Sequence, residues 1–225
     1  MPQIPTMGFS AFLKLISLSD KRQKSTIRER HKPSKDSKPY DRHRSLRRAI
    51  QKLATGTQTP AEVFAATSLI KNKGERRSTR LGIIRFLKWR KANPGQINFC
   101  DAIVIQSPGG FFRIRFEANC VMEMGGRRTA IHIWNTKEPK LQKSIVIAAL
   151  TLVQRNWPKE SDLVDDFAIL DLRNMQLHRW SENPKAYSTI VDAIMQYLDL
   201  QCKLSRNEFG LPTIGPQPKG PQLET

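Results

Sequence analysis

The stretch TAIHIWNTKEPKLQ, residues 129–142, joins the two hydrophobic patterns on which the fold depends. Ala130 to Trp134 is a short apolar run that is typical of a β-strand. In residues 140–154, apolar side chains occur on nearly every side of a helix, which predicts a helix buried against a sheet. The sequence therefore predicts a core strand that feeds a core helix.

Other strands flank this pair on both sides along the chain. Residues 101–105 form an apolar run, and residues 111–116 alternate, placing Phe112, Ile114 and Phe116 on one face. Gly125-Gly126 predicts a hairpin turn. Residues 167–170 read as a buried strand, and residues 176–180 as an edge strand. We expect an α+β (α/β-like) fold: a three-stranded antiparallel meander, then a helix and further strands, flanked by helices.

Helix signals concentrate before residue 95 and near the carboxyl end. Thr59-Pro60-Ala61-Glu62 predicts a helix start with a capping box. Helices are also expected over residues 41–56, 76–92 and 186–204. The second of these ends at Asn93-Pro94-Gly95, a strong helix breaker.

Four segments follow from these patterns. We expect residues 1–40 to be a flexible basic arm, with a linker at 19–39 and a short amphipathic helix at 8–18. That helix docks on the body of the protein or lies on a membrane surface, and docking is the commoner outcome. Residues 41–95 form a basic helical segment, 96–205 the α/β core and 206–225 a disordered tail.

Positive charge is the strongest global signal in the chain. The net charge is +18 and the isoelectric point is near 10.3. Residues 1–60 carry 14 Lys or Arg and 4 Asp or Glu, a net of +10, and residues 61–95 carry 9 and 2, a net of +7. Residues 96–225 carry 15 and 14, a net of +1. This asymmetry favours a nucleic acid, DNA or RNA, or an anionic surface as the partner of the amino-terminal half.

Compartment and cofactor signals are weak. Cys100, Cys120 and Cys202 are far apart, which favours a reduced, cytoplasmic compartment. The four histidines are equally scattered, so no zinc or other metal site is predicted. No apolar run is long enough for a membrane span. No Walker, GxGxxG or GxSxG spacing is present.

The predicted order from residue 59 onward is helix, three strands, helix, strand. This order resembles the PD-(D/E)XK nuclease-like core over residues 60–172. The resemblance implies an acid near the second strand and an acid-x-lysine pair on the third, which hold Mg²⁺ and a water for phosphodiester hydrolysis. Glu117 or Glu123 matches the first position, with His132 and Lys137 completing a divergent site. The motif is degenerate, because AIHIWNTK has no carboxylate. We therefore favour the interpretation that these are ordinary sheet-face and loop residues, and, within the family, a catalytically silent member.

Acidic residues elsewhere have two interpretations. Asp162, Asp165 and Asp166 either bind a cation or solvate a loop, and we favour the second. Asp171 ends a strand beside a turn, which indicates a structural role.

Ten basic residues on two predicted helices are the candidate nucleic-acid ligands: Arg42, Arg44, Arg47, Arg48, Lys52, Arg76, Arg77, Arg80, Arg85 and Lys88. With five to eight phosphates engaged, the log–log salt slope of binding would be roughly −4 to −7. A helix-turn-helix over residues 61–90 is an alternative arrangement of the same cations. The function hypotheses are nucleic-acid binding without catalysis by this chain, a divergent Mg²⁺-dependent nuclease, and a protein-interaction adaptor.

Overall fold

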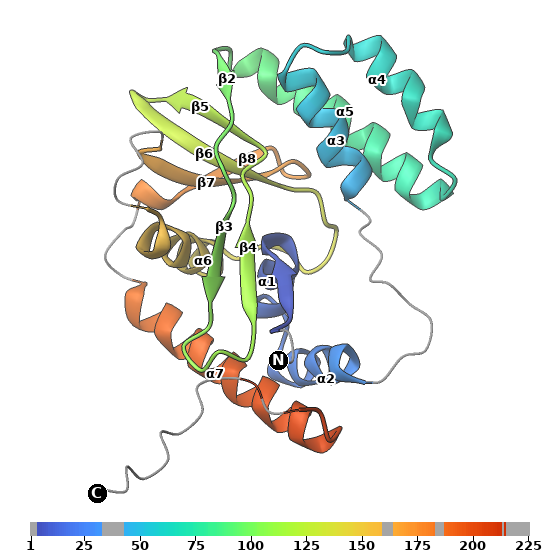
Figure 1. Ribbon diagram of the computed structural model, residues 1–225. Helices are drawn as coiled ribbons and strands as arrows, with labels where there is room; N and C mark the ends of the chain where they lie inside the picture. Colours follow the sequence, from blue (N-terminus) through green and yellow to red (C-terminus); the bar gives the residue numbers. More distant parts are fainter. Residues whose placement is uncertain (1–3, 33–42, 159–163, 183–186, 213, 215–225) are drawn as a thin grey trace, which may run out of the picture.

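The computed structural model describes residues 4–32, 43–158, 164–182, 187–212 and 214 (Figure 1). Its larger sheet has the strand order β2-β5-β6-β7-β8. The strands are β2 (Ile97–Asn98), β5 (Cys120–Met124), β6 (Arg127–Trp134), β7 (Asp166–Asp171) and β8 (Gln176–Arg179). Within this sheet only β6 and β7 pair in parallel, in a register that runs from Thr129↔Asp166 to Trp134↔Asp171.

Helix α6 (Lys143–Asn156) makes the crossover between the two parallel strands. Parallel neighbours need such a connection, because the chain must return to the other end of the sheet before it pairs again. Residues 146–153 of this helix are all buried. The predicted passage from strand into core helix is therefore confirmed.

The larger sheet is covered on both faces. Val121, Ala130 and Phe167 belong to one apolar cluster together with α6 and α1 (Phe9–Ile16). Alternate residues, including Met122, Ile131 and Leu170, belong to a second cluster with α3 (Arg44–Ala54) and α5 (Lys73–Ala92). The period-two alternation of strand side chains sends apolar residues to both sides, so both sides require a helical cover.

A second sheet lies in front of the first in the view of Figure 1 and has the order β1-β4-β3. Its strands are β1 (Thr6–Gly8), β3 (Ile103–Gln106) and β4 (Arg113–Phe116). Phe112, Ile114 and Phe116 are buried as predicted. The α+β class is confirmed.

The predicted three-stranded meander is wrong, because the two hairpins belong to different sheets. The chain leaves β4 and changes sheet before β5, at Asn119. The Asn119 amide donates to the Ile131 carbonyl at 2.8 Å, and its Oδ1 accepts from the Ile133 amide at 2.7 Å. β4 pairs instead with β1, which comes from the amino terminus.

The amino-terminal region is ordered over most of its length, contrary to the predicted flexible arm. Helix α1 docks on the core as predicted, with Phe9, Phe12 and Leu13 buried. Helix α2 (Asp20–His31) occupies part of the predicted linker and packs against α7 (Ser188–Glu208). Ile27 is 2% exposed, and it is the one buried residue of α2. With so few apolar residues, α2 has no helical periodicity that the sequence could reveal. The rest of the predicted linker, residues 33–39, lies outside the described residues.

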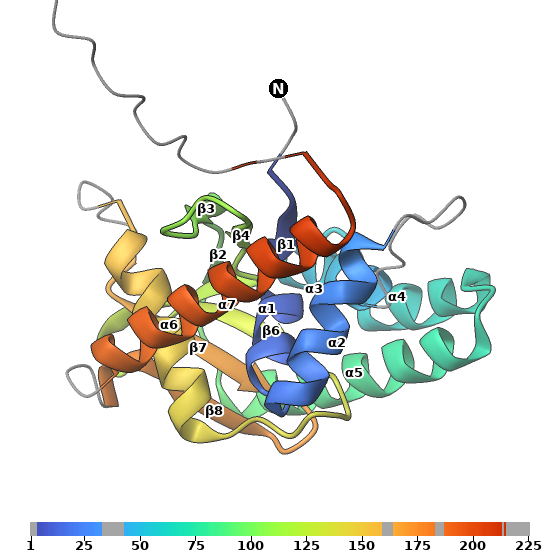
Figure 2. The same cartoon turned by 90° about the horizontal axis from the view of Figure 1, so that it is seen from below.

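Helices α3, α4 (Pro60–Ala66) and α5 form a layer on the side of the larger sheet opposite α6 (Figures 1 and 2). The capping box is confirmed: Thr59 Oγ1 accepts from the Glu62 amide at 3.3 Å, and Glu62 Oε2 accepts from the Thr59 amide at 2.7 Å. Helix α5 begins at Lys73, earlier than predicted, because Asn72 Oδ1 accepts from the Glu75 amide at 3.0 Å.

Close approach of α3 and α5 requires a glycine. A Cβ added at Gly82 would lie 2.7 Å from both methyl carbons of Leu46. At the other end of the chain, α7 continues to Glu208 and buries Arg206, so the predicted start of the tail at residue 206 is too early. Most of that predicted tail, residues 213 and 215–225, lies outside the described residues.

We expect Phe9→Ala to lower the free energy of unfolding by about 3–5 kcal/mol, because a buried aromatic ring leaves a cavity. The Phe9 ring is 2% exposed and lies 4.9 Å from the Phe116 ring, centroid to centroid. Urea denaturation measures the change. Phe99→Ala is the matched control, because Phe99 is 42% exposed; equal losses in the two variants would contradict the docking of α1.

Candidate nucleic-acid interface

The three predicted catalytic residues are not brought together. Glu123 on β5 pairs in register with Arg128 near the start of β6, whereas Lys137 lies beyond the end of that strand at Trp134. Arg128 and Trp134 are six residue steps apart along the strand, a distance of about 20 Å. The exposed Glu117 carboxylate accepts from Arg115 Nε at 3.3 Å. Within the described ranges, no three His, Cys, Asp or Glu side chains form a group that fits a metal ion.

His132, the fourth member of the hypothetical site, is a core residue. Its Nδ1 lies 3.1 Å from the Glu117 carbonyl oxygen and its Nε2 lies 2.8 Å from Ser10 Oγ. The Phe9 ring meets the imidazole edge-on at 5.1 Å. Burial is the main cause that lowers the pKa of His132 to about 4, so the ring is neutral at physiological pH. Both ring nitrogens have partners, and the arrangement is that of a satisfied structural histidine.

We expect His132 to make the protein less stable in acid. The pKa is about 4 in the folded protein against an ordinary 6.5, so the unfolded chain takes up this proton first. Acidification through this window therefore favours unfolding, by about 2–3 kcal/mol at pH 4.5. Urea midpoints at pH 7 and 4.5 should differ less in His132→Gln than in the natural protein. An unchanged pH difference would contradict the neutral buried ring.

The described part of the acidic loop serves the fold. Asp166 is fully buried and accepts from Arg179 Nε at 2.9 Å, from Ser181 Oγ at 2.7 Å and from two backbone amides. Asp165 forms an exposed ion pair with Arg128, which lowers the pKa of its carboxyl. Asp171 accepts from the amides of the following turn, as expected of a structural residue. Asp162 lies outside the described residues.

We expect Asp166→Ala to destabilise the fold by about 3–5 kcal/mol, since it leaves the guanidinium of Arg179, whose side chain is 21% exposed, without its counter-charge. Asp192→Ala is the control: Asp192 pairs with Arg155, but its side chain is 52% exposed, so the loss should be below about 1 kcal/mol. Thermal or urea unfolding measures both. Similar losses would contradict the buried role of Asp166.

The predicted cations of the first basic helix form an exposed row. Arg44, Arg48 and Lys52 are exposed and follow one another at intervals of four residues along α3, which places them on one face. Arg47 is half-buried and close enough to His132 to help lower the pKa of that ring. Arg42 lies outside the described residues.

The cations of α5 divide into two groups. Arg76 Nε donates to the Ile70 carbonyl at 2.9 Å, and Arg80 Nε donates to Thr67 Oγ1 at 2.7 Å, with its guanidinium 5.2 Å from the Phe64 ring centre. These two residues hold α5 against the segment that follows α4. Arg77 and Lys88 are exposed, and Arg85 is partly exposed. Lys71, Lys73 and Lys91 are also exposed in this part of the chain. They contribute to the net charge of residues 61–95, but they are not among the ten predicted nucleic-acid ligands.

We call residues 43–95, all of which the structure describes, the basic layer. It carries 13 Lys or Arg and 2 Asp or Glu, a net of +11. The two acids are Glu62, which serves the capping box, and Glu75, which accepts from Ser45 Oγ at 2.6 Å. The layer's own two carboxylates balance only two of its 13 cations, so its own charges sum to a strongly positive total.

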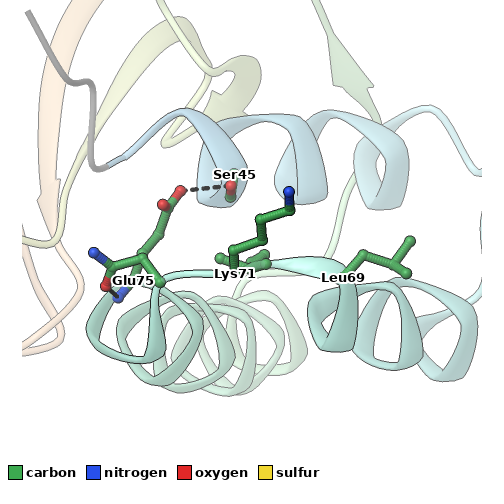
Figure 3. Close-up of a pocket in the computed structure, with 6 residues that line it drawn as sticks. Ser45, Leu69, Lys71 and Glu75 are labelled. Carbon is green, nitrogen blue, oxygen red and sulfur yellow. Dashed lines mark hydrogen bonds between the residues drawn. The ribbon is translucent and has the colours of Figure 1, made fainter.

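A hollow of about 550 Å³ opens between the starts of α3 and α5. Figure 3 shows Ser45 and Glu75 joined across it, with Lys71 directed toward α3 and Leu69 farther along its edge. Leu69 is 83% exposed. The hollow therefore belongs to the surface of the basic layer.

No family model and no curated protein matches this sequence. The resemblance to the PD-(D/E)XK nuclease-like core accordingly stays a prediction. In the part of the chain that the structure describes, no helix has the length and apolar character needed to cross a membrane. A role for the basic layer therefore rests on its charge and geometry.

Proposed function

We propose that this protein binds nucleic acid through its basic layer, without a chemical step by this chain alone. The observation that carries the proposal is the ratio of 13 cations to 2 carboxylates in the basic layer, which lies on one side of the larger sheet. Residues 96–225, by contrast, have a net charge of +1. Residues 1–42 carry a further +6, from 10 Lys or Arg and 4 Asp or Glu. A charge needed only for solubility has no reason to be absent from residues 96–225 in this way.

Phosphate groups match this surface physically. A nucleic acid holds a dense row of negative charges with condensed counterions, and cations that neutralise phosphates release those ions. The exposed row on α3 repeats about every 6 Å along the helix axis, four residues at a rise of about 1.5 Å each. Arg77 and Lys88 provide further exposed cations on α5. Such a surface binds strongly at low salt and weakly at high salt.

We expect the triple variant Arg44→Gln, Arg48→Gln, Lys52→Gln to weaken binding of a fluorescent duplex and to flatten its salt dependence. Each phosphate that is no longer neutralised removes about 0.9 from the log–log slope for B-DNA, so three such phosphates remove about 2–3. Fluorescence anisotropy over a series of salt concentrations measures this. The three side chains are exposed, so the fold should be retained.

The matched control is Lys143→Gln, Arg155→Gln, Lys203→Gln, which removes the same formal charge from exposed residues of α6 and α7. It should leave the slope nearly unchanged. Equal effects of the two triple variants would show that only the overall charge matters. Affinity that does not fall with salt would remove the proposal, and capture of a protein that survives nuclease treatment would favour an adaptor role.

A further inference from the structure

Helix α5 presents a mixed stripe to solvent. Arg77, Leu81, Ile84, Lys88 and Lys91 follow at alternating intervals of four and three residues, opposite the buried face formed by Thr79, Gly82, Ile83, Phe86 and Trp89. Leu81 is 40% and Ile84 is 51% exposed. The stripe covers about 21 Å of helix. Two aliphatic side chains therefore stand next to each other at its centre, with cations before and after them.

Phosphate attraction explains the cations of this stripe but not the aliphatic residues. From Arg76 to its end, α5 contains no acid, so the whole exposed face attracts an anionic partner. A partner that suits the stripe must therefore combine two rows of negative charge with an apolar group between them. The major groove of B-DNA has this chemistry: phosphates border it on both sides, and each thymine presents a methyl group on its floor.

We propose that α5 enters the major groove of duplex DNA, with Leu81 and Ile84 contacting thymine methyl groups and Arg77, Lys88 and Lys91 contacting the bordering phosphates. This inference rests on the proposed function and specifies duplex DNA as the nucleic acid that is bound. The groove is about 12 Å wide and admits one α-helix. Helix α5 is the longest helix of the basic layer, and α3 and the sheet hold it from its opposite face.

Other anionic partners fit this stripe less well. The major groove of double-stranded RNA is too deep and narrow for a helix. Single strands are held by stacking on aromatic rings. The basic layer has three aromatic residues, of which Phe86 and Trp89 are buried and Phe64 lies under Arg80. An anionic membrane surface would take a wider apolar face with its aromatic residues outward.

The test compares a short A·T duplex with the same duplex in which uracil replaces thymine, so that only the methyl groups are removed. We expect fluorescence anisotropy with the full chain to show weaker binding of the uracil duplex. The affinity should fall about fourfold for each methyl group that α5 covers in the thymine duplex, because burying one carbon contributes ~0.8 kcal/mol. The double variant Leu81→Ala, Ile84→Ala should bind both duplexes alike and keep the salt slope of the natural protein.

The matched control is Leu200→Ala, Leu204→Ala, two aliphatic residues of α7 that are 52% and 53% exposed. It should retain the preference for thymine. Equal affinity of the natural protein for the two duplexes overturns this inference, and if binding still falls with salt, the proposed function stands. Tighter binding to double-stranded RNA, to a single strand or to vesicles of anionic lipid also overturns the inference. Absence of salt-dependent binding to every nucleic acid removes both proposals.

Discussion

The parallel pairing of β6 with β7 is the constraint on which the rest of the structure depends. Two parallel neighbours cannot be joined by a hairpin, so the chain between them must cross one face of the sheet. Helix α6 makes that crossing, and its residues 146–153 are buried. Both strands thereby lie inside the larger sheet, with apolar side chains on each face. A sheet of this kind is stable only when both faces are covered.

The need for a second cover explains where the charge lies. Helices α3 and α5 bury one side of each helix against Met122, Ile131 and Leu170. Gly82 lets α5 approach Leu46 of α3 closely. The opposite sides of these helices face water, and that is where the exposed cations are found. One packing requirement thus gathers charges that the sequence spreads over some fifty residues into one layer (Figure 1).

The candidate site shows the difference between proximity in sequence and proximity in space. Glu117, Glu123 and Lys137 lie within a short stretch of the chain, yet β5 and β6 run antiparallel and carry Glu123 to one end of β6 and Lys137 to the other. His132 is surrounded by Phe9 and Ser10, which come from the amino-terminal helix. No local pattern announces that contact, because it depends on where α1 docks. Similarly, Ile27 is the one buried residue of α2, a helix that packs against α7 from the far end of the chain.

The sequence by itself determined the local elements: the capping box at Thr59, the hairpin turn at Gly125-Gly126, the alternation of Phe112, Ile114 and Phe116, and the buried helix after Trp134. These depend on backbone preferences and on the period of apolar residues, both of which act over a few neighbours. The tertiary structure alone decided that the two hairpins lie in different sheets, that β1 pairs with β4 and that residues 20–31 form a helix on α7. The last two outcomes depend on contacts between residues more than a hundred positions apart. Many pairings satisfy the same local pattern, and only the packing of the whole chain selects one.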